Sequence, residues 1–152
     1  CSMNVLNTTP YHYLKRIDGS LTNKFLPDYF TLNAERVFLV LEQYKNWGMC
    51  TEEVRRILAN IYVRYLFSAL QRNCDKRSDM NHAQRKEWLK QQYKTPLCKE
   101  LLSAVQASGT LFKCMAKAFC AGNIPLCLMI ARSIFAVKSA FPTVFSTLKQ
   151  QH

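Results

Sequence analysis

The apolar residues of this chain change their spacing once, near residue 28, and this change constrains the fold most strongly. Before it, Tyr11 and Tyr13 alternate with polar neighbours, a period-2 pattern that is typical of a β-strand. The dipeptide of Asp18 and Gly19 that follows favours a turn. After it, apolar residues recur at intervals of three and four, which is typical of amphipathic α-helices. The sequence therefore predicts a short strand and turn followed by a long helical segment.

The predicted fold is mainly α: a bundle of about five to six helices, preceded by a short N-terminal β-strand and turn. A chain of 152 residues is long enough to bury a core. We expect residues 1–24 to be the terminal strand and turn of another domain, and residues 25–152 to form a helical domain. Thr51 and the dipeptide Thr95-Pro96 are strong helix starts, because threonine caps a first turn and proline fits the first helical position. The predicted helices cover residues 32–47, 52–73, 82–93, 96–105, 110–120 and 126–140, with a last turn at 144–148.

The same periodicity predicts which side chains form the core. The first helix is expected to bury Val37, Leu41 and Tyr44, with Phe38 and Val40 alongside. The second helix is expected to bury Val54, Ile57, Leu58, Ile61, Tyr62, Tyr65, Leu66 and Leu70.

Seven cysteines are scattered along the chain, and their number is odd. Cys114, Cys120 and Cys127 lie in apolar helical runs, where a thiol behaves as a small hydrophobic group. This pattern favours reduced thiols in a cytoplasmic compartment over a disulfide framework. No apolar run reaches the roughly 18–20 residues that a membrane span requires. We therefore expect a chain that is in solution or lies at a surface.

The charge of the chain is strongly unbalanced, with 21 Lys and Arg against 10 Asp and Glu and a net charge of +11. Such a balance admits nucleic acid, an anionic membrane surface or a phosphorylated ligand as a partner. Basic residues gather between the second and fourth predicted helices: Arg72, Lys76, Arg77, Arg85, Lys86, Lys90, Lys94 and Lys99.

The basic face of the third predicted helix, made of Arg85, Lys86, Lys90 and Lys94, is the candidate surface for anionic lipid headgroups or an acidic partner. A merely solvated basic face is the alternative. Nucleic acid is disfavoured, because no recognition element accompanies the charge and the nearby aromatic residues fit a core stripe equally well.

The motifs of enzymes are missing from this sequence. There are only four glycines, and neither a phosphate-binding glycine loop nor a G-x-S-x-G elbow occurs. There is no D-x-D to hold a metal against a diphosphate, and no C-x-x-C or histidine spacing that suits zinc. We therefore assign no catalytic residue, no metal ligand and no cofactor to this chain.

The segment around the predicted turn carries side chains of the kind that bind a diphosphate. Lys15 and Arg16 supply two cations, and Ser20 and Thr22 supply two hydroxyl groups. Charge-assisted hydrogen bonds and hydroxyl donors are the usual means of binding phosphate oxygens. An edge strand with solvated polar residues is the alternative interpretation.

The same segment resembles the end of the catalytic domain of bacterial family 2 glycosyltransferases, enzymes that make cell-surface polysaccharides. Their motif is roughly Tyr-x-Tyr-Arg-x-Arg-x-x-Ser-Ile/Leu-Thr followed by a helical tail. Leu14 stands where many members have the first Arg, and the spacing from Arg to Ser is one residue longer here. The matching residues are Tyr11, Tyr13, Arg16, Ser20, Leu21 and Thr22.

The resemblance implies that this chain is the C-terminal region of a larger enzyme, and its first residue, Cys1 rather than Met, fits that expectation. The parent's own N-terminal catalytic domain, an α/β nucleotide-sugar domain with a D-x-D site for Mg²⁺ or Mn²⁺, would precede it. Arg16, Ser20 and Thr22 would bind the diphosphate of the nucleotide-sugar donor. The helices would shape the side that binds a lipid-linked acceptor, form a homodimer, or dock the enzyme on the inner face of the plasma membrane. Alone, this chain should not transfer sugar.

Two other functions stay open from the sequence. One is a stand-alone helical interaction or adaptor domain whose basic face meets an acidic partner. The other is a binder of membrane surfaces or nucleic acid that has no connection with sugar transfer. A lone strand argues against both, because its edge would have no sheet to join.

Overall fold

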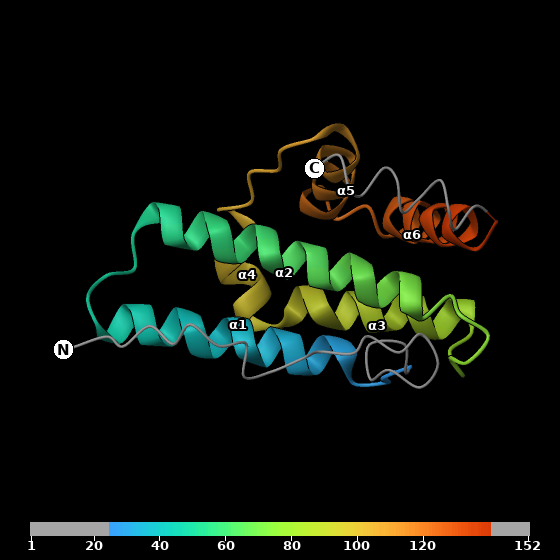
Figure 1. The fold of residues 1–152 in the computed structure, drawn as a ribbon, viewed down its shortest axis with the longest axis horizontal. Coiled ribbons are helices and arrows are strands. Elements are labelled where there is room, and N and C mark those ends of the chain that lie inside the picture. The colour runs from blue at the N-terminus through green and yellow to red at the C-terminus, as the bar shows by residue number, and fades with distance from the viewer. Residues whose placement is uncertain (1–24, 141–152) are drawn as a thin grey trace, which may run out of the picture.

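The computed structural model describes residues 25–140, and its fold is mainly helical, as the sequence predicts. The predicted N-terminal strand and turn, and the last turn at 144–148, lie outside the described residues. Figure 1 shows the helices of the described part: α1 (Tyr29–Asn46), α2 (Glu52–Arg72), α3 (His82–Lys94), α4 (Pro96–Leu102), α5 (Thr110–Cys120) and α6 (Ile124–Ala140).

Short polar side chains fix where several of these helices begin. The Thr51 hydroxyl accepts a hydrogen bond from the backbone N–H of Val54 at 3.3 Å, and Thr95 caps α4 in the same way. Both predicted starts are confirmed. Asn81 opens α3 with a capping box, since its side chain and that of Gln84 each accept a backbone N–H of the other residue. These caps satisfy N–H groups that have no partner inside the helix.

Helix α2 is the centre of the bundle, because it contacts α1, α4, α5 and α6. Its buried residues include Val63 and Phe67, both completely buried, in addition to the predicted Leu66 and Leu70. Ile57, which the periodicity places in the core, is 49% exposed, so this prediction is wrong. The buried side of α2 does not include Ile57, because this helix packs against neighbours on more than one side.

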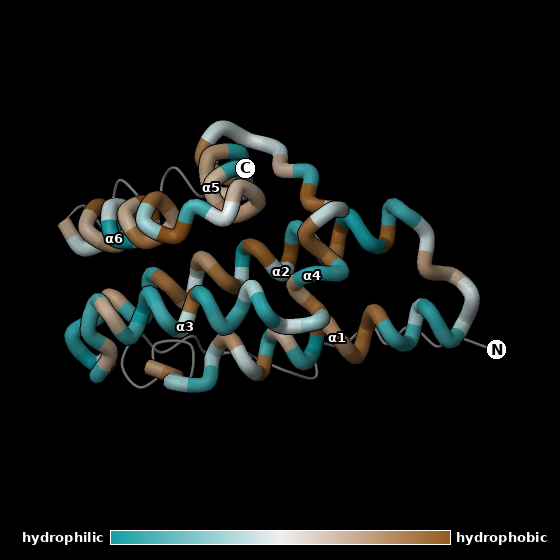
Figure 2. Tube along the Cα trace, turned by 180° about the vertical axis from the view of Figure 1, so that it is seen from behind, coloured by the Kyte–Doolittle hydropathy of each residue, from teal (hydrophilic) through white to brown (hydrophobic). Residues whose placement is uncertain are grey.

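Helix α1 buries only the stripe that faces α2. Val37 and Leu41 are buried as predicted, but Phe38 is 45% exposed and Val40 is 38% exposed. The wide apolar face predicted for this helix is therefore only partly covered. At the start of α1, the Phe30 ring packs edge-on against Tyr62 at 5.4 Å and Trp88 at 5.3 Å between ring centroids. Figure 2 shows α1 and α2 side by side.

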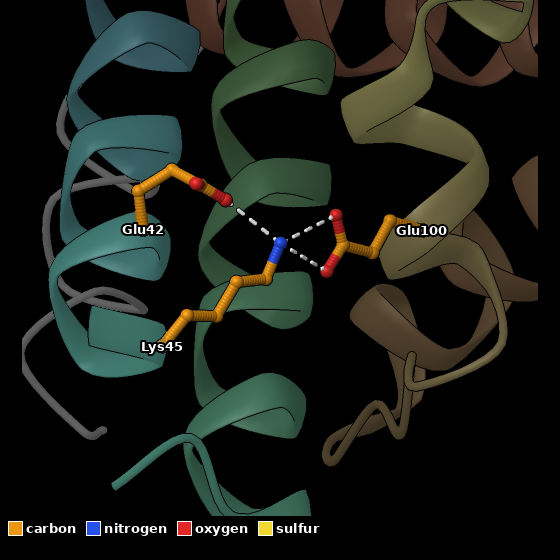
Figure 3. A network of polar contacts seen from close by, with 3 residues as sticks. All are labelled: Glu42, Lys45 and Glu100. Carbon is orange, nitrogen blue, oxygen red and sulfur yellow. Dashed lines mark hydrogen bonds and ion pairs between the residues drawn. The ribbon is translucent and has the colours of Figure 1, made fainter. Parts of the chain in front are cut away.

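A lysine on α1 joins this helix to α4. The Lys45 ammonium lies 2.8 Å from a carboxylate oxygen of Glu42 and 2.8 Å from one of Glu100, as Figure 3 shows. The carboxylates of Glu100 and Glu42 raise the pKa of Lys45. All three side chains remain about one-third exposed, so solvent screens the bridge and it stabilises the fold only modestly.

The second half of the bundle is built on α3, α5 and α6. The Tyr93 ring stacks on Phe119 at 4.7 Å, and the Tyr93 hydroxyl donates a hydrogen bond of 2.7 Å to the backbone carbonyl of Phe119. Gly122, with a φ of 65°, adopts the left-handed conformation after α5 that glycine allows without strain. Asn123 then caps α6 by accepting the backbone N–H of Leu126 at 3.1 Å. These contacts place α6 against α2 and α3.

Candidate functional site

The residues predicted to bind a donor diphosphate, Arg16, Ser20 and Thr22, lie outside the described residues. Their role therefore stays a prediction. The predicted basic face lies on α3, which Figure 2 shows mostly in hydrophilic colours.

Three of the four basic-face residues lie on one side of α3. Lys86, Lys90 and Lys94 follow one another at intervals of four residues and are all exposed. Residues at this spacing lie above one another on a helix. Glu87 interrupts the positive charge, because the Lys90 ammonium lies 3.3 Å from its carboxylate. The hydrogen bonds from Lys90 and Gln91 lower the pKa of Glu87.

Arg85 points elsewhere and is held by the loop that follows α2. Its guanidinium donates two hydrogen bonds to the backbone carbonyl of Met80, at 3.1 Å and 2.9 Å, and a weaker one to the Cys74 sulfur at 3.8 Å. It is only partly exposed. Arg85 is therefore not part of the exposed row that Lys86, Lys90 and Lys94 form along α3.

Arg85 and Lys86 instead contribute to a pocket between the loop after α2, the start of α3 and the helix α6. Its volume is about 260 Å³. Basic groups reach it from two helices, none of the residues that line it carries a carboxylate, and apart from Arg132 the wall on the α6 side is apolar. The lining residues are Cys74, His82, Arg85, Lys86, Pro125, Leu128, Met129 and Arg132. This arrangement favours a small anion that carries an apolar group.

Sequence reasoning missed Arg132, the basic residue that α6 brings to this pocket. The periodicity presents it only as a polar interruption of an apolar helix. A signal was nevertheless available, since no Asp or Glu occurs after Glu100 in the whole sequence. Every charged residue of α5 and α6 is therefore basic, so these two helices carry only positive side-chain charge.

A second hollow, of about 390 Å³, lies between α1, α2, the end of α3 and the start of α4. Phe30, Phe38, Tyr62 and Leu97 contribute its apolar walls, and Glu35 is the one charged residue that lines it. It can accept an apolar side chain but offers no group for acid–base chemistry apart from this carboxylate.

The buried thiols of the bundle are poor nucleophiles. Burial raises the pKa of Cys98 and that of Cys127 to about 11 in each case. The reactive form of cysteine is the thiolate, so both thiols are protonated and inert at neutral pH. Between residues 25 and 140, no three His, Cys, Asp or Glu side chains gather in a way that could hold a metal ion.

No helix within the described residues combines the length and the apolar character that crossing a bilayer requires. Comparison with protein-family models, with curated proteins and with solved structures finds no match for this chain. The fold and the basic pocket are thus the structural observations from which function has to be inferred.

Proposed function

We propose that this chain is the C-terminal helical region of a glycosyltransferase that moves a sugar from a nucleotide-sugar donor to a saccharide acceptor, most simply a lipid-linked one. The observation that carries the proposal is the segment from Tyr11 to Thr22, with its paired tyrosines, its Arg16 and its Gly-Ser-Leu-Thr run. The helical bundle that follows supports the proposal, because the resemblance implies a helical tail after that motif.

In the intact enzyme, Arg16 and Ser20 would bind the donor diphosphate, and Thr22 would add a further hydroxyl donor. Negative charge develops on the leaving nucleotide during transfer, and a guanidinium placed beside it stabilises that charge. The resemblance implies that the preceding catalytic domain would hold Mg²⁺ or Mn²⁺.

The bundle would hold the enzyme at the cytoplasmic face of the membrane, where lipid-linked acceptors are found. The support for this role is the exposed row of Lys86, Lys90 and Lys94 on α3, together with the absence of any carboxylate in α5 and α6. A basic residue close to an anionic membrane surface contributes about 1 kcal/mol to binding.

The proposal is tested on the polypeptide that contains this sequence in its source cells. An antibody against residues 1–152 isolates that polypeptide, which is then incubated with nucleotide sugars and a lipid extract of the cell envelope. We expect release of nucleoside diphosphate from one donor, and none when residues 1–152 are assayed alone. A polypeptide that turns over no nucleotide sugar, and carries no second domain, would overturn the proposal.

The second candidate is a stand-alone interaction domain, and one observation favours it. The outer side of α1 and the turn after it expose apolar side chains that a soluble helix normally covers: Leu32, Phe38, Leu39, Trp47 and Met49. Exposed apolar patches of this kind often mark an interaction site. The native polypeptide's size separates the two candidates, because only a glycosyltransferase needs a further domain.

A further inference from the structure

We propose that the pocket between α3 and α6 is a binding site for the phosphate group of an anionic lipid, with the lipid's apolar part resting on the α6 side. This inference depends on the described residues of the pocket alone. It stands or falls separately from the proposed sugar transfer, which depends on the segment before residue 25.

Three nitrogen-bearing side chains of the pocket are available to a ligand. His82 and Lys86 lie one turn apart on α3, and Arg132 faces them from α6. Within the described residues, none of these three side chains has a hydrogen bond or an ion pair with another residue. Arg85 is different, because its two hydrogen bonds to Met80 fix its guanidinium. It adds positive charge to the pocket without having to reorient.

A guanidinium and an ammonium that converge without a carboxylate between them suit a phosphate group. Arginine binds phosphate oxygens in pairs through its planar fork of N–H donors, and lysine adds a compact positive charge. The capping box that opens α3 already satisfies the backbone N–H of Gln84, and the phosphate would be held mainly by the side chains of Lys86 and Arg132. Carboxylate ligands are matched less well, because they carry less charge than a phosphate monoester.

The apolar wall distinguishes a lipid from free phosphate. Pro125, Leu128 and Met129 line the pocket on the α6 side, and Met129 is 58% exposed. Leu128 is already buried, but an inorganic anion would leave Pro125 and Met129 in water, whereas the glycerol and first methylene groups of a lipid would cover them. Small-molecule sites usually enclose about 300–1,000 Å³, so this pocket suits a headgroup rather than a complete nucleotide sugar.

The test uses the full chain of residues 1–152 and three probes at concentrations below their micelle-forming range. Dihexanoyl phosphatidate carries both the phosphate and the apolar part, glycerol 3-phosphate carries only the phosphate, and dihexanoyl phosphatidylcholine carries a neutralised headgroup. Titration calorimetry gives each Kd. We expect phosphatidate to bind more tightly than glycerol 3-phosphate, and both to bind more tightly than phosphatidylcholine.

Three variants separate the pocket from general surface charge. Arg132→Gln should weaken phosphatidate binding about tenfold, the usual effect of losing a charge-assisted hydrogen bond. Met129→Gln should weaken binding of phosphatidate but not of glycerol 3-phosphate. Lys113→Gln is the matched control, because Lys113 is exposed on α5 and does not line the pocket.

Three results would overturn the proposal. The first is the absence of phosphatidate binding. The second is equal weakening by Arg132→Gln and Lys113→Gln, which would mean attraction to overall charge. The third is equally tight binding of glycerol 3-phosphate and phosphatidate, which would mean a site for soluble phosphate. All three variants change exposed side chains, so loss of folding should not obscure the result.

Discussion

Neutralising the exposed lysines of α3 should weaken membrane binding. The size of the effect should depend on whether the lysine already pairs with a carboxylate. Neither Lys86 nor Lys94 forms an ion pair within the described residues, whereas the Lys90 ammonium lies 3.3 Å from the Glu87 carboxylate. Each unpaired basic residue near an anionic surface contributes about 1 kcal/mol. The double variant Lys86→Gln/Lys94→Gln should therefore lose about 2 kcal/mol, which is about 30-fold in affinity.

The opposite effect is expected for Glu87→Gln. This change removes the carboxylate that pairs with Lys90, so the Lys90 charge becomes available to the lipid. Binding should strengthen by about 1 kcal/mol, or roughly fivefold. Lys90→Gln should weaken binding by less than either unpaired lysine, because its charge is already partly compensated.

The assay is co-sedimentation of residues 1–152 with vesicles of phosphatidylserine in phosphatidylcholine. It is repeated at about 1 M salt, where screening extends to only about 3 Å and binding should be lost. Arg36→Gln on α1 is the control, because Arg36 is exposed and far from the α3 face in sequence. If the double variant binds like the wild type, or if Glu87→Gln fails to strengthen binding, α3 is not the docking surface.

Three further predictions concern stability. Tyr93→Phe keeps the aromatic stack but removes the hydrogen bond to α5, so the free energy of unfolding should fall by about 1 kcal/mol, and Tm by about 2–4 °C. Glu100→Gln should cost only about 0.5 kcal/mol, because the bridge to Lys45 is partly exposed. Since the pKa of Lys45 is raised, this bridge contributes fully below pH 10.5 and is lost as pH rises further. The hydrogen bonds from Arg77 lower the pKa of Asp75 to about 2, so the stability from this pair is present above pH 3.8 and is lost as pH falls toward 2.

Denaturant unfolding followed by circular dichroism measures all three effects. A Tyr93→Phe variant as stable as the wild type would mean that water replaces the hydrogen bond without cost. For the bridge, a Glu100→Gln variant whose stability falls as steeply as that of the wild type near pH 10.5 would contradict the role given to Glu100. Asp75→Asn should remove part of the acid-dependent loss, and an unchanged acid profile would contradict the role given to Asp75.

The order and the starts of the helices could be predicted because they depend on local chemistry. Thr51 and Thr95 cap their helices through hydrogen bonds three residues ahead, which the sequence shows directly. The buried side of α2 could not be predicted equally well. Its exposure of Ile57 and burial of Val63 depend on helices that pack on more than one side, and periodicity within one helix does not contain that information.

The candidate site likewise has one part that the sequence predicts and one part that it does not. The lysine row of α3 follows from its four-residue spacing. The pocket does not, because Lys86 and Arg132 come together only when α6 packs on α3. The position of Arg85 was equally hidden, since its contact with the Met80 carbonyl depends on how the loop after α2 folds back.

The most direct test of the central proposal is the turnover of the intact enzyme when Arg16 is replaced by Ala. The polypeptide that contains this chain and its preceding domain is assayed for release of nucleoside diphosphate, beside a matched Arg36→Ala variant. We expect Arg16→Ala to lower kcat by about 100-fold, the usual effect of removing one group that stabilises developing charge. It should leave acceptor binding nearly unchanged, and Arg36→Ala should behave as the wild type. Equal turnover of the two variants would contradict the assignment of this chain to a glycosyltransferase.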